Sequence, residues 1–214
     1  MKKAIIIFAM VVLSTGLVKG QELSTTYSLR SYYTFSWNFT FPMGDFSKWV
    51  DKTSIAGFDF GGRYLIMNGL TTGFNVAWQR VDNIYENETY YFPDKGMAIT
   101  ATNYRETWMV PFQAVIGYHL NPDKMISPYA TLGIGGDYME HHVMIQEYDI
   151  YQTQWDFSLT PEIGVLAKFG KFSNWAGLVA FNYKWTTNKI DLIDDKSGNL
   201  SMLNLKIGLA YCIN

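Results

Sequence analysis

Apolar and polar residues alternate with a period of two along most of this chain. The last stretch shows it most clearly, because Leu203, Leu205 and Ile207 alternate with Asn204 and Lys206. A period of two is typical of a β-strand whose two faces meet different surroundings, whereas a helix repeats every 3.6 residues. Eight segments follow this pattern, and we expect a strand in each: 30–41, 55–66, 70–80, 104–120, 128–140, 155–169, 175–187 and 202–211.

The connections between these segments alternate strictly between short and long. The short ones are 67–69, which contains an Asn-Gly hairpin signal, 121–124 and 170–174. The long ones are 42–54, 81–103, 141–154 and 188–199. Outer-membrane barrels have short periplasmic turns and long extracellular loops, and an even number of strands places both ends of the barrel on the periplasmic side.

The two faces of the predicted strands differ in size as well as polarity. One face carries large aromatic and aliphatic side chains, and the other carries glycine, alanine, threonine, asparagine and charges. An eight-stranded barrel is only wide enough inside for side chains to fill, so the bulky apolar face must point to lipid. The predicted fold is therefore all-β, an eight-stranded antiparallel up-and-down transmembrane β-barrel. Aromatic residues near the strand ends would form its two interfacial girdles: Trp37, Trp78, Trp108, Tyr118, Tyr138, Trp155, Phe169, Trp175 and Trp185.

Composition and the N-terminal residues agree with an exported membrane protein. Aromatic residues make up 17% of the chain and charged residues 17%, against about 25% charged residues in typical soluble domains. The net charge of −2 argues against a nucleic-acid partner. Lys2 and Lys3, followed by the apolar run 4–12 and small residues before Gln21, predict a cleaved signal peptide. We expect a signal peptide at 1–20, one barrel domain at 21–214, and location in the cell outer membrane.

Several segments resemble a known group, the small eight-stranded outer-membrane barrels of the OmpA/OmpX type. They are GFDFGGRYL (57–65), PFQAVIGY (111–118), PYATLGIGG (128–136), PEIGVLAKF (161–169) and LKIGLAY (205–211). The resemblance implies that outer-membrane lipid and lipopolysaccharide surround the protein and that the barrel-assembly machinery inserts it. Chains of the OmpA type continue into a peptidoglycan-binding domain, whereas we expect this chain to stop with its last strand. It also departs from the usual aromatic end, because Cys212, Ile213 and Asn214 follow Tyr211.

Seven charged residues fall on the inward face of the predicted strands. Two interpretations are open: a gated polar path in which Glu162 faces Lys184, Lys206 or Arg63, or a network of ion pairs that fills a barrel without a pore. The narrow lumen favours the second, because a buried charge is costly unless it is paired. The residues are Asp59, Arg63, Asp137, Glu162, Lys168, Lys184 and Lys206.

Metal sites and cofactors are not expected. His141 and His142 follow Glu140, but adjacent residues of a strand point to opposite faces, which favours an ordinary surface loop over a chelate. Asp191, Asp194 and Asp195 could bind Ca²⁺, although carboxylates in a surface loop are usually only solvated. We expect a structural role for His119 and an inert, inward-facing Cys212, which as the single cysteine has no disulfide partner within the chain.

An enzymatic role is not expected either. Lipid deacylases of this size place a histidine and a serine two residues apart on one strand face, because the base must reach the nucleophile. Neither His119 nor His142 has such a serine, and Ser158 and Glu162 share a face that lacks a histidine.

The loops offer a set of exposed aromatic residues that could bind a ligand or pack within the loops. The sequence therefore predicts a non-enzymatic barrel with a structural or surface-interaction role through long extracellular loops, whose ligand stays open. The alternatives are a narrow channel for small solutes and a lipid-modifying enzyme. The loop aromatics are Trp49, Tyr85, Tyr90, Tyr91 and Phe92.

Overall fold

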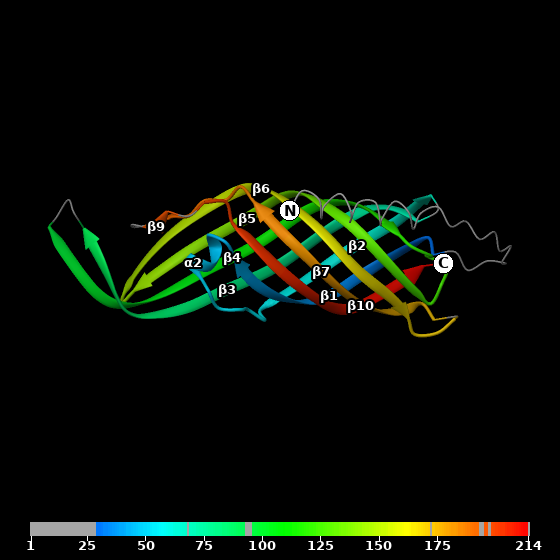
Figure 1. Cartoon of the computed structure of the whole chain (residues 1–214), viewed down its shortest axis with the longest axis horizontal. Coiled ribbons are helices and arrows are strands. Elements are labelled where there is room, and N and C mark those ends of the chain that lie inside the picture. Colours follow the sequence, from blue (N-terminus) through cyan, green and yellow to red (C-terminus); the bar gives the residue numbers. More distant parts are fainter. Residues whose placement is uncertain are drawn as a thin grey trace, which may run out of the picture.

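Eight strands close into one antiparallel barrel in the order β1-β10-β7-β6-β5-β4-β3-β2 (Figure 1). The computed structural model describes residues 29–67, 69–92, 96–171, 173–192, 195–196 and 198–213, so the predicted signal peptide lies outside the described residues. Pairing of β1 with β10, from Ser31↔Ile213 to Met43↔Ser201, closes the ring. The barrel strands are β1 (Ser31–Met43), β2 (Gly57–Met67), β3 (Leu70–Phe92), β4 (Met97–His119), β5 (Ile126–Ile145), β6 (Tyr148–Lys168), β7 (Trp175–Thr186) and β10 (Ser201–Ile213).

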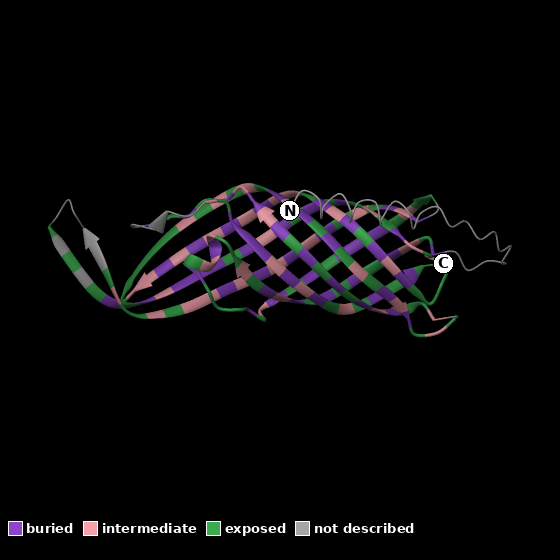
Figure 2. Ribbon diagram, in the orientation of Figure 1, coloured by how far each residue is buried: buried purple, intermediate pink, exposed green. Residues whose placement is uncertain are grey.

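Buried and exposed residues alternate along the barrel strands (Figure 2), as in the pattern of β1. In β1, Ser36 and Asn38 are each 1% exposed, whereas Phe35 is 56% and Trp37 is 50% exposed. A soluble protein would bury its large aromatic side chains, so this distribution requires an apolar environment around the barrel. The predicted fold and the predicted orientation of the two strand faces are confirmed.

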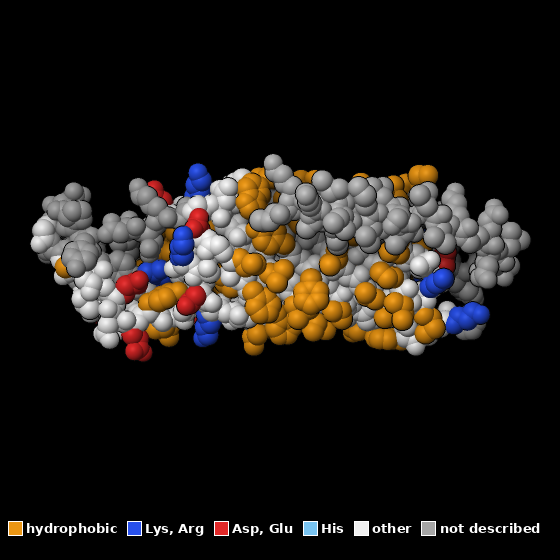
Figure 3. Space-filling model, viewed as in Figure 1, with side chains coloured by type: hydrophobic (Ala, Val, Ile, Leu, Met, Phe, Trp, Pro, Cys, Tyr) orange, Lys and Arg blue, Asp and Glu red, His pale blue; other side chains and the backbone are white. Residues whose placement is uncertain are grey.

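On the face that Figure 3 shows, apolar side chains form a belt over the middle of the barrel, and charged side chains lie beyond it at both ends, with more of them at the end where β3 to β6 project. Aromatic residues mark both borders of the belt. At the projecting end, the rings of Trp78 and Trp108 meet edge to face at 5.4 Å, and at the other end Trp175 and Tyr211 do so at 5.2 Å. These two groups are the interfacial girdles of a membrane barrel.

The periplasmic turns are as short as the sequence predicts. Gly69, in the link between β2 and β3, has a φ of +87°, and a Cβ there would lie 2.5 Å from the His119 carbonyl oxygen. Only glycine fits both constraints. Asn121, after β4, has a φ of +55°, which asparagine tolerates better than most residues.

Two of the four predicted long loops are wrong, because strands continue through them. β3 and β4 stay paired from Val81↔Thr107 to Phe92↔Met97, and β5 and β6 from His141↔Gln152 to Ile145↔Tyr148. The polar residues that suggested loops alternate as in the barrel, but they stand beyond the apolar belt, where the outer face meets water. The result is a sheet of β3 to β6 that projects from the barrel (Figure 1).

The other two long links keep little regular structure. The link 44–56 contains a short helix, α2 (Phe46–Trp49), and the link after β7 contains β8 (Asp191–Leu192) and β9 (Asp195–Lys196). Within the described part of the chain, no helix is long and apolar enough to cross a bilayer.

Candidate functional site

The half of the lumen nearer the periplasmic end contains a buried chamber, which we call the lower chamber, in which one lysine pairs with two carboxylates. Lys206 Nζ lies 2.8 Å from Asp59 Oδ2 and 2.9 Å from Glu162 Oε2. Asn75 donates to Asp59 at 2.6 Å, and Tyr129 donates to Glu162 at 3.0 Å. Since β2, β6 and β10 supply the three charges, the pairing exists only in the closed barrel.

A second ion pair lies nearer the extracellular mouth. Lys184 Nζ is 2.7 Å from Asp137 Oδ2, and Ser158 donates to the other Asp137 oxygen at 2.8 Å. Gln113 donates to Ser158 at 2.8 Å, and Lys184 also reaches Gln79 Oε1 at 3.5 Å. Amides and hydroxyls thus occupy the remaining bonding capacity of the buried charges, as low dielectric surroundings demand.

Two of the predicted lumen charges behave differently from the rest. Arg63 borders the lower chamber but donates to backbone carbonyls, to Gly62 at 3.1 Å and to Phe74. Lys168, 9% exposed near the periplasmic end, forms no ion pair with another described residue. Cys212 is fully buried on the inward face, as predicted.

Little space remains between these groups. The cavity beside Lys206 and Glu162 has a volume of about 10 Å³, and the one beside Gln79 and Lys184 about 20 Å³. Each is about the size that one water molecule needs. In the described lumen, side chains therefore occupy most of the space around these two groups of charges.

The extracellular mouth is closed by an apolar plug. The helix α2 lies across the opening, with Phe46 fully buried and Trp49 3% exposed. The prediction of Trp49 as an exposed loop aromatic is wrong, because its indole donates to Thr107 Oγ1 at 3.1 Å and its ring packs under the Arg105 guanidinium at 5.0 Å. The plug consists of Phe46, Trp49, Val50, Val81, Met109, Met139, Val143, Ile190, Leu192, Leu200 and Met202.

Tyr85 also packs within the molecule. Its hydroxyl donates to the Trp49 carbonyl oxygen at 3.2 Å, and its ring lies 4.7 Å from the Arg105 guanidinium. Burial raises the pKa of the Tyr85 phenol, so the hydroxyl stays a donor. The other predicted loop aromatics, Tyr90, Tyr91 and Phe92, belong to β3, and their side chains lie outside the described residues.

The two adjacent histidines point to opposite faces of β5. His141 is fully buried and bonds to Thr107 Oγ1 at 2.9 Å and Asn188 Oδ1 at 2.8 Å, so its assignment to a surface loop is wrong. Through Asn188 it holds the link after β7 against the plug. His142 faces outward, 3.1 Å from the Asp149 carboxylate. In the described part of the chain, no group of three potential ligands could hold a metal ion.

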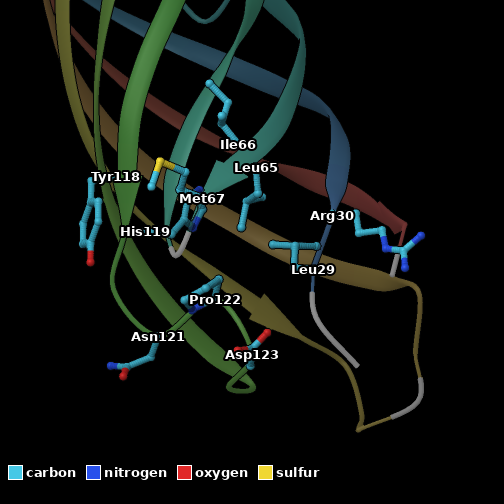
Figure 4. Close-up of a pocket in the computed structure, with 11 residues that line it drawn as sticks. Leu29, Arg30, Leu65, Ile66, Met67, Tyr118, His119, Asn121, Pro122 and Asp123 are labelled. Atoms are coloured by element: carbon cyan, nitrogen blue, oxygen red, sulfur yellow. The ribbon is translucent and has the colours of Figure 1, made fainter. Parts of the chain in front are cut away.

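A cavity of about 440 Å³ opens at the periplasmic end (Figure 4). Leu65, Met67 and Pro122 border it, while Arg30 and Asn121 extend away from it. At its base, His119 bonds to the Tyr32 hydroxyl at 2.7 Å and to Ser127 Oγ at 3.0 Å.

The contact between His119 and Ser127 joins two neighbouring strands, which sequence spacing on a single strand did not reveal. Ser127 is 2% exposed and donates to the Leu120 carbonyl at 3.2 Å. Buried side chains of His119 and Ser127 therefore link β4 to β5 at the base of the cavity.

The projecting sheet has one protected edge. Arg80 donates its amide to the Ala56 carbonyl at 2.9 Å, so the amides of Asp82 and Ile84 face the same side. The Asn83 side chain accepts from the Ile84 amide at 2.9 Å, and a bulge between Tyr85 and Glu88 then interrupts the strand. These features block the addition of another strand to β3.

The opposite edge, on β6, has no strand paired with it along 149–155, although the link after β7 lies beside it, where the Asp191 amide donates to Gln152 Oε1 at 2.9 Å. Phe157 exchanges hydrogen bonds with Thr187 at 3.0 and 3.1 Å, so Trp155, Thr153 and Tyr151 turn their backbone groups to the same side. No described residue pairs with these backbone groups; Gln152 and Gln154 reach Lys189 with their side chains only. The open edge carries neither lysine nor proline, and we name it the β6 edge, residues 149–155.

Comparison with known proteins identifies the architecture. No family model and no curated protein matches the sequence. The chain is similar to Ail, the attachment invasion locus protein of Yersinia pestis (13% identity, 87% of this chain and 100% of that chain, TM-score 0.50). It is also similar to Neisserial surface protein A (13%, 86% and 97%, TM-score 0.52). Identities this low show the fold alone: the chain has the fold of the small outer-membrane β-barrels.

Proposed function

We propose that this protein is a non-enzymatic outer-membrane barrel that binds an extracellular protein through its projecting sheet. The observation that carries the proposal is the asymmetry of the sheet: the β3 edge is blocked, whereas the backbone groups that the β6 edge turns outward have no hydrogen-bond partner among the described residues. Natural proteins usually blunt their edge strands, because an unpaired edge recruits other chains. An edge left open on a rigid, exposed sheet is suited to β-augmentation, in which a partner adds one strand.

A filled lumen supports this role over the alternative of a narrow channel. The described lumen is occupied by ion pairs and amides, and α2 covers its mouth. Attachment is also the role named for Ail, the similar protein of Yersinia pestis.

The test is to block the β6 edge without disturbing the barrel. Thr153→Pro removes an amide that faces the open side, whereas Thr153→Ala keeps it. Bacteria displaying each variant would be compared for adhesion to cultured epithelial cells. We expect Thr153→Pro to lower adhesion to the level of bacteria without the protein, and Thr153→Ala to retain it.

The gel mobility of unheated samples would verify that both variants fold into barrels. Equal adhesion by the two variants would contradict the role of the edge. Single-channel currents from the wild-type protein in planar bilayers would favour the channel instead.

A further inference from the structure

A strip of aromatic and acidic side chains runs along the outer face of β5 and β6. It consists of Tyr138, Glu140, His142, Tyr151 and Trp155, and we name it the outer strip. Strand pairing places Tyr138 opposite Trp155 and His142 opposite Tyr151, with Glu140 between the two pairs. The first pair has its ring centroids 5.3 Å apart, and the second pair is stacked at 5.7 Å with a 24° interplanar angle.

Within the outer strip, only Tyr138 and Trp155, the pair nearer the barrel, belong to the membrane girdle. Tyr151 is four residues beyond Trp155 on β6, which corresponds to about 13 Å along the strand. Both rings are nonetheless 66% exposed. The Tyr151 ring lies beyond the apolar belt and is exposed, so it does not contact the lipid chains. Membrane anchoring therefore explains Trp155 but not Tyr151.

The polar groups of the outer strip are acidic and already oriented. Glu140 accepts from the Tyr138 hydroxyl and lies 3.8 Å from His142 Nε2, while Asp149 holds the other ring nitrogen at 3.1 Å. Aromatic faces carry negative partial charge and attract C–H groups, and carboxylates accept from hydroxyls. The combination of two open rings with a carboxylate between them matches a sugar chain, which offers both kinds of group.

We propose that the outer strip binds the neutral sugar headgroup of a glycolipid in the leaflet that surrounds the barrel. The strip faces sideways from the barrel wall and begins at the girdle, so lipid headgroups are its immediate neighbours. The strip includes neither lysine nor arginine, and Glu140 with the adjoining Asp149 repels phosphate, sulfate or carboxylate groups. The outer strip shares Tyr151 and Trp155 with the β6 edge, but it uses their side chains, whereas the proposed partner-binding role uses the backbone groups of that edge.

Lipid retention tests the proposal directly. The full barrel would be reconstituted in nanodiscs of zwitterionic phospholipid with equal amounts of a lactosyl lipid, its sulfated form and the same lipid without sugar. Native mass spectrometry of the released barrel then counts which lipid stays bound. We expect preferential retention of the neutral lactosyl lipid, and a loss of roughly two- to tenfold in Tyr151→Ala, the range expected for one aromatic contact.

The matched control is Tyr148→Ala, since Tyr148 is 75% exposed on the same strand but has the opposite parity. Tyr151→Phe keeps the ring and should retain the lipid, which separates loss of the platform from misfolding. Equal retention by wild type and Tyr151→Ala, or preference for the sulfated lipid, overturns the proposal. Binding of free lactose without retention of the lactosyl lipid would show that the site takes a soluble glycan, which also overturns it.

Discussion

Replacing Lys206 with methionine tests whether the lumen charges stabilise the barrel as a matched set. The chamber beside Lys206 contains two carboxylates, Asp59 and Glu162, and two cations, Lys206 and Arg63. Its formal charge is therefore zero, and Lys206→Met changes it to −1 while nearly preserving side-chain volume. Removing one partner of a buried ion pair costs about 3–5 kcal/mol, and here the lysine serves two carboxylates at 2.8 and 2.9 Å.

We expect Lys206→Met to lower the free energy of unfolding by about 3–5 kcal/mol. Adding Glu162→Gln returns the chamber to zero, with Asp59 and Arg63 remaining, so the double variant should be more stable than Lys206→Met. The coupling between the two changes should be about 2 kcal/mol, within the usual range for contacting residues. Lys124→Met, an exposed substitution in the turn after β4, is the control and should cost less than about 0.5 kcal/mol.

The assay is equilibrium urea unfolding in lipid vesicles, followed by tryptophan fluorescence and by the gel mobility of unheated samples. A cost below about 1 kcal/mol for Lys206→Met would refute the reasoning, because no buried charge would then be left unpaired at significant cost. The reasoning would also be refuted if the double variant lost as much free energy of unfolding as the Lys206→Met and Glu162→Gln variants lose together.

Three further predictions concern the plug, its anchor and a turn. Trp49→Ala should cost about 3 kcal/mol locally and open 44–56 to protease in intact cells, whereas Trp49→Phe should stay largely resistant. His141→Leu removes two buried hydrogen bonds, so amide exchange at 188–192 should accelerate by roughly tenfold or more; unchanged exchange would show that the plug does not depend on this anchor. Gly69→Ala should lower the free energy of unfolding by about 1–2 kcal/mol, measured by urea midpoint, and a neutral effect would mean that the turn can relax.

The alternation of side chains made the barrel predictable from sequence. Residues 203–211 place the large apolar side chains on one face by a period of two, and this local rule holds wherever the strand lies. The inward burial of Asp59, Glu162, Lys184 and Lys206 follows from the same parity. Which of these charges meet does not follow, because Lys206 pairs with groups far away in sequence, and only strand register and barrel closure bring them together.

The loop regions show where sequence reasoning stopped. Charged and aromatic residues in 81–103 and 141–154 suggested exposed loops, but polarity on an outward face has the same pattern in a strand that extends beyond the membrane. Trp49 and His141 were assigned to the surface because their surroundings in sequence are polar. Their burial depends on α2 folding back over the mouth. There Trp49 bonds to Thr107 of β4, and His141 bonds to Asn188 in the link after β7.

The sequence by itself determined the number of barrel strands, the short turns and the face of the side chains within the membrane-spanning part of each strand, since these depend on neighbours a few residues apart. The tertiary structure alone decided the ion pairs of the lumen, the plug and the difference between the two edges of the projecting sheet. Each of these arises between segments that are remote in sequence. Their energies come from burial, hydrogen bonding and charge pairing across the closed barrel, which no local pattern encodes.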